Sequence, residues 1–449
     1  MFKKILTAAM ALSLAVMCLA SCGDDASSAD SSASSAPEST SQTDSSGSGD
    51  GSSDDGSTAQ NGDGKYGTDK FPVSETALKE SDLPTENMLG RSVLNKGDQA
   101  RLAAMIKKGQ ALDIKADDAQ TIAFIGGSIT QGSSASGNNQ YVNAVGQWWH
   151  DNVTRKSIVV NAGIGATDSY IGVHRVDRDV LSYNPDVIFI EFSVNDVDPV
   201  LNEKSYDSLI RKCMSQENNP AVVLIIMTQD NGTSLQDVHE VIAKHYDLPT
   251  ISYHDAVYPE VAAGTLDWKI ISNDNIHPNN TGHPLLTKLI TSYLEDVVAN
   301  LDSIDTSSVS AFSAESETGD VYADATIGSR ETPDLVKVID EGTFTEETNF
   351  QKFTGGWETL DAGSIKFEME FRNLGVIFYK SAKGLMGKAE VFIDGESVAL
   401  LDGDFPNGWG DYAYGQEIYT SDAKAKHTVE VKVDEADVVD FRILDWLIS

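Results

Sequence analysis

Residues 121–130 read TIAFIGGSIT, a short apolar run that two glycines and a serine follow at once. Such a run, closed by glycine, predicts a buried strand that ends in a tight turn. Similar runs recur at 157–160, 186–192, 221–227 and 250–253. Amphipathic stretches predict helices at 100–109, 141–153, 205–213, 234–245 and 284–297. Strands that alternate with helices predict a three-layer α/β/α domain whose parallel sheet is covered on both faces.

The pattern changes after residue 300. Residues 302–318 are rich in Ser, Thr and Asp, and the runs beyond them are short and β-rich, without helices between them. Asp394-Gly395 lies between two of these runs and is typical of a hairpin turn. We therefore expect an α/β domain at 65–300, a linker at 301–319 and an all-β, jelly-roll-like sandwich at 320–449.

The N-terminus predicts export and anchoring. Lys3 and Lys4 precede an apolar run that ends in Leu19-Ala20-Ser21-Cys22, as in a secretory signal. These last four residues resemble the lipobox of bacterial lipoproteins, which implies a signal peptide at 1–21 and a membrane anchor through lipid on Cys22. The rest of 22–64 is rich in Ser and acidic residues and lacks Lys, Arg and aromatic residues, which predicts a disordered tether. The expected location is the extracellular face of a bacterial cell membrane.

Charge and cysteine content exclude several classes of function. The chain has 33 basic and 69 acidic residues, a net charge of −36, which argues against binding nucleic acid or docking on anionic lipid through a basic patch. Of the three cysteines, Cys18 leaves with the signal and Cys22 carries lipid. Cys213 then has no intramolecular partner, which excludes a disulfide framework and a cysteine metal cluster.

Polar groups follow the predicted strands at the edge where reactive groups collect in parallel sheets. Ser128 follows the first strand, where it suits a nucleophile with free backbone N–H groups nearby or a helix N-cap. The turn at 161–167, NAGIGAT, and Asn195 follow the next two strands, and both residue patterns also occur in ordinary turns. Asp274 and His277 precede the last helix at a spacing that lets a carboxylate orient an imidazole base.

The order of these four blocks resembles the SGNH/GDSL hydrolases, whose blocks contribute Ser, Gly, Asn and His. The resemblance covers about residues 101–297 and implies a flavodoxin-like fold and acyl transfer. Position by position, Ser128 is similar to the nucleophile, His277 to the general base and Asp274 to its orienting carboxylate. The resemblance implies no cofactor and no metal. A metal site made of Asp274, His277 and His283 is conceivable on residue types but is not favoured.

The same resemblance implies an oxyanion hole with three departures from the family pattern. Its donors are the backbone N–H of Ser128, the N–H of Gly165 or Ala166, and the Asn195 side chain. Gly127 stands where the signature has Asp, and Val194 stands where Gly is common. Ala166 aligns best with the family's Gly, with Gly165 one residue earlier. None of these departures removes a reacting side chain, so we expect an active enzyme.

The chain is similar to carbohydrate O-acetylesterases, which implies an acylated, above all acetylated, polysaccharide or oligosaccharide as substrate. Trp409 and Tyr412 in the Gly-rich loop NGWGDYAYG are candidates for stacking on sugar rings, whereas the pattern around Trp446 predicts a core position. No protein partner is evident. Two alternatives stay open: an esterase, lipase or acyltransferase for other acyl esters, and a catalytically inactive glycan-binding surface lipoprotein.

Overall fold

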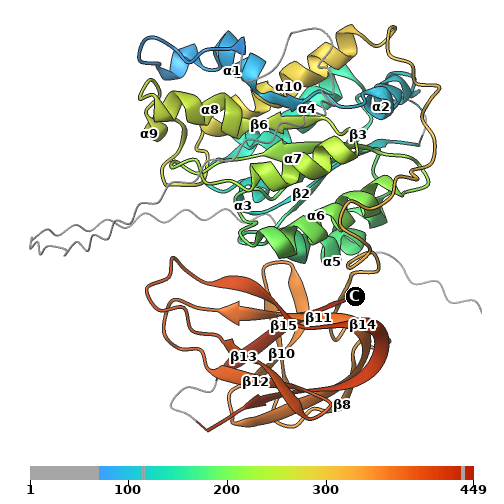
Figure 1. Cartoon of the computed structure of the whole chain (residues 1–449), viewed down its shortest axis with the longest axis vertical. Helices are drawn as coiled ribbons and strands as arrows, with labels where there is room; N and C mark the ends of the chain where they lie inside the picture. The colour runs from blue at the N-terminus through green and yellow to red at the C-terminus, as the bar shows by residue number, and fades with distance from the viewer. Residues whose placement is uncertain (1–69, 114, 116, 436–439) are drawn as a thin grey trace, which may run out of the picture. The chain divides into compact units, whose positions relative to one another are not determined.

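The computed structural model describes residues 70–113, 115, 117–435 and 440–449 (Figure 1). The predicted signal peptide, the lipidation site at Cys22 and the tether lie outside the described residues. None of the helices in the described ranges combines the length and the apolar character that crossing a membrane requires.

The first sheet has six strands in the order β1-β6-β5-β4-β2-β3. Strands β2 to β6 pair in parallel and confirm the predicted α/β sheet. Strand β1 pairs antiparallel with β6 at one edge, and its three residues are too few to produce a pattern in the sequence. The bounds are β1 Val93–Asn95, β2 Gln120–Gly126, β3 Ser157–Gly163, β4 Val187–Glu191, β5 Ala221–Ile226 and β6 Thr250–Ser252.

Helices cover both faces of this sheet (Figure 1). Successive side chains of β2 alternate between two core clusters: Phe124 packs in the first, and Ala123 and Ile125 pack in the second. The first cluster includes residues of α2, α4, α8 and α10, and the second includes residues of α5, α6 and α7. The helix bounds are α1 Glu86–Arg91, α2 Ala100–Gln110, α3 Ser128–Gln131, α4 Tyr141–Asn152, α5 Ser169–Asp179, α6 Pro199–Met214, α7 Gln236–His245, α8 Tyr253–Ala262, α9 Trp268–Ile271 and α10 Gly282–Ala299.

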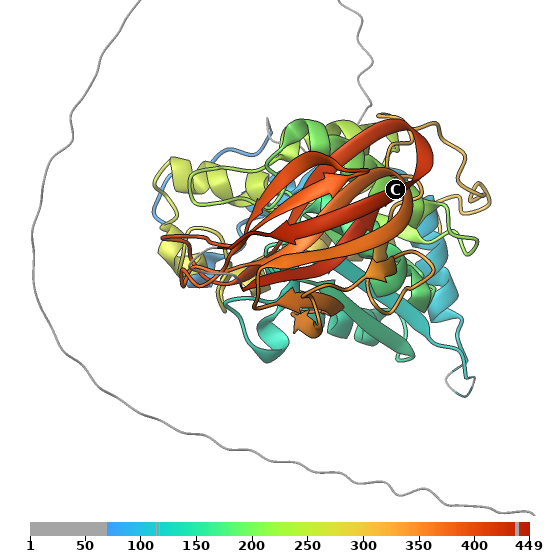
Figure 2. The ribbon, with the colours of Figure 1, turned by 90° about the horizontal axis from the view of Figure 1, so that it is seen from below.

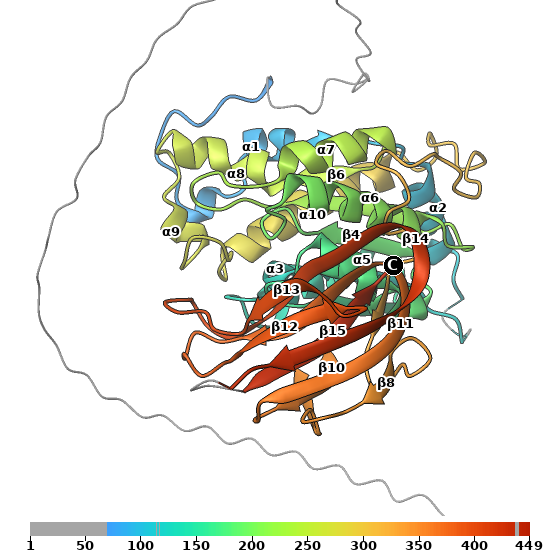
Figure 3. The ribbon, with the colours of Figure 1, turned by 60° about the horizontal axis from the view of Figure 1, so that its bottom comes forward.

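Helix α5 is not among the predicted helices, because its polar residues hide the apolar stripe. Its N-cap is Asp168, whose side chain accepts a hydrogen bond from the Ile171 N–H at 2.9 Å. Figure 3 shows α5 beside strands of the second sheet. Two glycines there permit close packing: a Cβ on Gly375 would lie 2.2 Å from the Tyr170 hydroxyl, and one on Gly415 would lie 2.8 Å from Ile171.

The second sheet confirms the predicted all-β part. All nine strands pair antiparallel, and the long ones, coloured orange to red, are seen from below in Figure 2. The bounds are β7 Thr326–Gly328, β8 Lys337–Asp340, β9 Glu346–Phe350, β10 Phe353–Thr359, β11 Gly363–Lys380, β12 Lys388–Ile393, β13 Glu396–Asp402, β14 Tyr412–Val433 and β15 Phe441–Ile448.

Two long strands connect two layers of this part. The first half of β11 and the second half of β14 pair together beside β8 and β12, whereas the second half of β11 pairs with β15. Register shifts between Phe371 and Gly375 separate the two halves of β11, as expected where a strand passes from one layer to another. Trp446 is fully buried in the core between the strands, as predicted. Asp394 and Gly395, with φ of 51° and 87°, form the predicted hairpin turn between β12 and β13.

Residues 301–325, which include the predicted linker, contain no helix or strand. They are nevertheless held against the α/β part, because the hydroxyls of Ser316 and Thr318 donate to the Asp207 carboxylate of α6 at 2.7 and 2.8 Å.

Glu191, the last residue of β4, is an ionisable group inside the core. It is fully buried, and Thr130 Oγ1 donates to its Oε2 at 3.1 Å, while Oε1 has no partner among the described residues. Burial raises the pKa of this carboxyl to about 7, against the opposing effect of the Thr130 hydrogen bond.

We expect Glu191→Gln to flatten the pH dependence of stability. The pKa is near 4.5 in the unfolded chain and about 7 in the folded one. The folded state therefore binds the Glu191 proton more tightly than the unfolded chain does. The contribution of this proton to the free energy of unfolding is complete below about pH 4.5 and is lost as the pH rises through 7. Between pH 4.5 and 8, the wild-type free energy of unfolding in urea should fall by about 3 kcal/mol more than that of the variant.

Glu347→Gln, a change at an exposed carboxyl of β9, is the matched control and should retain the wild-type pH dependence. Parallel curves for the wild type and Glu191→Gln would contradict the assignment.

Candidate active site

Three parallel strands bring the first three sequence blocks together. In the sheet Gly126 of β2 pairs with Gly163 of β3 and with Glu191 of β4, so the three strands end at one level. Ser128 follows β2 as the first residue of α3 and is half-buried. As the first helical residue, it has a backbone N–H with no partner within the helix.

The structure brings Ser128, His277 and Asp274 into one hydrogen-bonded chain. Ser128 Oγ lies 2.8 Å from His277 Nε2, and His277 Nδ1 lies 2.9 Å from Asp274 Oδ2. The fourth block is thus next to the first, although 149 residues separate Ser128 from His277. The side chains of His277 and Asp274 are 26% and 43% exposed, so the chain of groups opens to solvent.

The loop that carries His277 is held by its own polar groups. Ser272 Oγ lies 2.6 Å from the His277 carbonyl and 2.8 Å from the Asp274 carbonyl, within reach of both for its single proton. Trp268 Nε1 donates to the Asp274 carbonyl at 2.6 Å. Burial acts to raise the pKa of Asp274. Hydrogen bonds from the N–H groups of His277 and Ile276 and from the His277 ring outweigh it and keep the pKa below its usual value. Asp274 is therefore an ionised acceptor that orients the imidazole.

The turn after β3 offers free N–H groups beside Ser128. Ala166 adopts a left-handed conformation with φ of 61°, which is uncommon for a residue other than Gly. A Cβ placed on Gly165 would lie 3.8 Å from Ser128 Cβ, so this residue is next to the serine. Within the described part of the chain, the N–H groups of Gly165 and Ala166 have no hydrogen-bond acceptor. Both are free to donate to a bound group.

The Asn195 side chain packs directly on Gly127, and this contact explains the glycine. A Cβ on Gly127 would lie 2.2 Å from Asn195 Oδ1, closer than any real contact. A side chain at position 127 therefore cannot coexist with Asn195 in its present place. Val194, the other departure in this block, is buried in the first core cluster.

Asp196, the residue after Asn195, forms a buried hydrogen-bonded pair with His239. Asp196 accepts from the Ser169 N–H at 2.7 Å, and its other oxygen lies 2.8 Å from His239 Nε2. His239 in turn stacks on Tyr206, with ring centroids 3.7 Å apart. These contacts fix the Asn195 turn to the start of α5.

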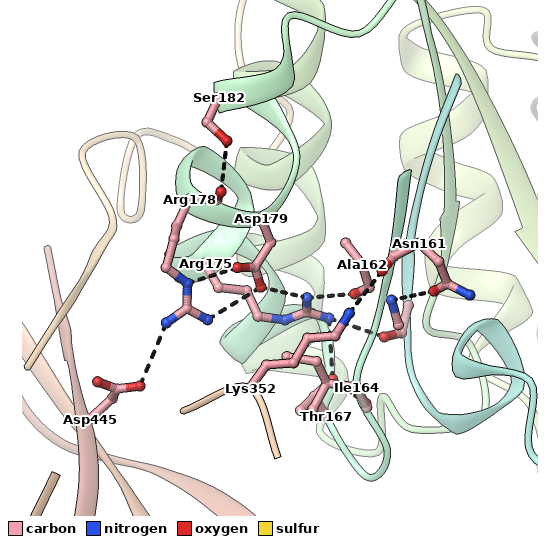
Figure 4. Close-up of polar contacts among 12 residues, drawn as sticks. Asn161, Ala162, Ile164, Thr167, Arg175, Arg178, Asp179, Ser182, Lys352 and Asp445 are labelled. Carbon is pink, nitrogen blue, oxygen red and sulfur yellow. Dashed lines mark hydrogen bonds and ion pairs between the residues drawn. The ribbon is translucent and has the colours of Figure 1, made fainter. Parts of the chain in front are cut away.

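Arg175 of α5 is a residue that the motifs did not reveal. Its side chain is fully buried and reaches the ends of two strands (Figure 4). One guanidinium nitrogen donates to the Ala162 carbonyl at 2.6 Å and to Asp179 at 3.1 Å, and the other donates to the Gly126 carbonyl at 3.0 Å and lies 3.4 Å from Thr167 Oγ1. The only sequence signal for Arg175 is a basic residue within a mostly polar helical segment, and that signal does not show that the side chain is buried.

The turn between β9 and β10 also reaches the site. Gln351 Nε2 lies 3.4 Å from the Gly165 carbonyl, and Lys352 Nζ donates to the Asn161 carbonyl at 2.8 Å (Figure 4). Asn161 itself donates to the Thr130 carbonyl at 2.9 Å. The all-β part thus contacts the turn beside Ser128, a juxtaposition that no sequence pattern predicts.

His283 does not join Asp274 and His277 around a metal position. Its ring accepts from the Tyr141 N–H at 3.3 Å and lies 3.2 Å from the Ser133 carbonyl. Burial lowers the pKa of His283 to about 4, so the ring is neutral and caps the start of α4. Across the described ranges, no three His, Cys, Asp or Glu side chains are arranged to hold a metal ion.

Trp409 and Tyr412 belong to a surface cluster of aromatic rings. Trp409 is 70% exposed, and its ring centroid lies 4.9 Å from that of Tyr412. The Phe405 ring packs against both. Among the described contacts, none joins this cluster to Ser128.

Comparisons with known proteins identify the family of this chain. Residues 124–285 match the GDSL-like Lipase/Acylhydrolase family. A two-domain esterase active on acetylated mannans is 31% identical, with a TM-score of 0.71, and the match covers 80% of this chain and 97% of that chain. The match to the same esterase co-crystallised with mannopentaose has the same identity and TM-score and covers 96% of that chain.

Comparison with curated proteins gives no match. The first esterase is matched over nearly its whole length, through both the α/β and the all-β parts. The chain therefore belongs to the GDSL-like lipase/acylhydrolase family, the SGNH hydrolases, and is a carboxylic-ester hydrolase.

Proposed function

We propose that this chain is a serine esterase that removes acetyl groups from a polysaccharide or oligosaccharide of the mannan type. The single observation that carries the chemistry is the hydrogen-bonded chain from Ser128 Oγ through His277 to Asp274. The activity of the 31% identical esterase on acetylated mannans supports the substrate class.

The reaction follows from the geometry in two acyl-transfer steps. His277 Nε2 takes the hydroxyl proton as Ser128 Oγ attacks the ester carbonyl, and Asp274 stabilises the resulting imidazolium. His277 then gives this proton to the sugar oxygen, which leaves as the alcohol. In the second step His277 takes a proton from water, the water attacks the acetyl-serine, and acetate leaves as Ser128 Oγ regains the proton. The chain's own side chains supply every proton transfer in this scheme.

The developing oxyanion needs donors, and three groups meet this need. They are the backbone N–H of Ser128, the unpaired N–H of Gly165 or Ala166, and the side-chain amide of Asn195. Loss of one such donor typically lowers kcat by about 10²–10³-fold. Trp409 is exposed and Tyr412 is half-buried beside it. Their rings supply flat faces suited to sugar rings, which makes them the candidate outer contacts of a long substrate.

Acetate release from acetylated mannan tests the function. We expect the purified protein to release acetate and Ser128→Ala to be inactive while retaining the same melting temperature. Ser313→Ala, the same change at an exposed serine between α10 and β7, is the matched control that should remain active. If the protein hydrolyses an aryl acetate but releases no acetate from mannan or xylan, the esterase activity is supported and the polysaccharide substrate is contradicted. No hydrolysis of either by the folded protein would favour an inactive binding protein.

We expect Gly127→Ala to resemble Asn195→Ala, because the new Cβ displaces the Asn195 amide. Each variant should lower kcat on an aryl acetate by about 10²–10³-fold. The double variant should lose little more than either single one, since both remove the same donor. Gly410→Ala, where a Cβ meets no atom within 4 Å, is the control. Wild-type kcat in folded Gly127→Ala would rule out this role for Asn195.

We also propose that lipid on Cys22 holds the enzyme at the cell surface. The support is the sequence Leu19-Ala20-Ser21-Cys22 behind a basic and apolar leader. In cells that process lipoproteins, Cys22→Ser should move the protein from the membrane fraction into the soluble or secreted fraction. Membrane retention of that variant would contradict the anchor.

A further inference from the structure

We infer that Arg175 is a positioning residue for the oxyanion hole, holding the turn that carries the Gly165 and Ala166 N–H groups in register with Ser128. This inference rests on the proposed function. It concerns a residue of α5 that lies outside the four sequence blocks and that touches no reacting atom.

The hydrogen bonds of the Arg175 guanidinium connect two segments of the site. They join the carbonyl of Gly126, two residues before Ser128, to the carbonyl of Ala162, three residues before Gly165. A third contact, 3.4 Å long, reaches Thr167 Oγ1 at the far side of the same turn. One rigid, planar group thus spans the segments before and after the turn, which a flexible ammonium group cannot do at once.

The guanidinium also shares an acceptor with the turn. Gly126 is the last residue of β2 and Gly163 is the last residue of β3, so the turn begins directly beyond this pair. The Gly126 carbonyl accepts the Ile164 N–H at 3.1 Å and the guanidinium at 3.0 Å. The Ile164 peptide leads directly into Gly165 and Ala166. Because the guanidinium and the turn share this acceptor, a shift of one moves the other.

Arg175 is itself held in place. Asp179, one helical turn later, accepts from Arg175 at 3.1 Å and from Arg178 Nε at 2.7 Å. Arg178 lies 3.8 Å from the buried Asp445 of β15 (Figure 4). A charge fixed by ion pairs on one side can bind neutral carbonyls on the other without freedom to rotate. Arg178 Nε donates to Asp179 Oδ1 whereas Arg175 donates to Oδ2, so loss of Arg178 leaves the Arg175 ion pair in place. Arg178 contacts no residue of the turn and is therefore the control.

A stabilising role alone makes a different prediction from a positioning role. If Arg175 only stabilises the fold, its loss lowers the melting temperature and leaves the folded enzyme as active as before. If it positions the turn, the folded variant loses affinity for the tetrahedral state while substrate binding stays the same.

The test compares Arg175→Lys with Arg178→Met in the full protein. Steady-state kinetics on an aryl acetate gives kcat and KM, and phenylboronic acid, which forms a tetrahedral adduct on a catalytic serine, gives an inhibition constant. We expect Arg175→Lys to lower kcat by at least about 10-fold and to weaken boronate inhibition by the same factor, with KM within about 2-fold. Arg178→Met should retain the wild-type kcat and boronate affinity even if it melts earlier.

Three outcomes overturn the inference: a wild-type kcat in folded Arg175→Lys, a fall in kcat without weaker boronate binding, and an equal fall in both arginine variants. If Arg175→Lys does not fold, Thr167→Val decides, because it removes the turn's own contact to the guanidinium and to the Ile164 carbonyl. It should lower kcat and boronate affinity together, and unchanged values overturn the inference. An inactive wild type whose boronate affinity does not depend on Ser128 refutes the proposed function instead.

Discussion

Parallel pairing of β2 with β3 and β4 is the constraint on which the site depends. It puts Gly126, Gly163 and Glu191 at one level, so the segments that follow them must share a small space at one edge of the sheet. That crowding brings Ser128, the turn at Gly165 and the Asn195 amide together. A carbonyl oxygen has two lone pairs, and at Gly126 the Ile164 N–H occupies one of them, which leaves room for a second donor. In this chain the buried guanidinium of Arg175 is such a donor, and the hydroxyl of Thr130 satisfies one oxygen of buried Glu191.

The close approaches around the site depend on residues without a side chain. Gly127 leaves room for the Asn195 side chain. In the same way, Gly375 and Gly415 let α5 pack closely against the second sheet. Because α5 contacts both the strand ends and the all-β part, the two parts share one core cluster. The turn with Gln351 and Lys352 adds polar contacts on the same side. The all-β part is therefore a structural neighbour of the turn beside Ser128, whether or not it also contacts sugar.

Much of this arrangement could be predicted from the sequence, because it depends on local patterns. Short apolar runs predicted β2 to β6, Asp394-Gly395 predicted its hairpin, and the spacing of Asp274 and His277 predicted their contact. Strand β1 could not be predicted, because three residues at an antiparallel edge have no periodicity. Arg175 could not be predicted either, since its partners are backbone carbonyls and any residue type supplies those. The contact of Gln351 with Gly165 depends on how two separate sheets pack, which no window of sequence encodes.

The proposed reaction depends above all on Ser128 being a nucleophile that His277 activates. Intact-mass and peptide-mass analysis after brief treatment with an organophosphonate ester measures this directly, because the reagent reacts with an activated serine hydroxyl. The account predicts one adduct per chain, located on the peptide that contains Ser128. It also predicts that Ser128→Ala forms no adduct and that His277→Ala forms it far more slowly. An adduct on another residue, or labelling of Ser128 at the same rate without His277, would contradict it.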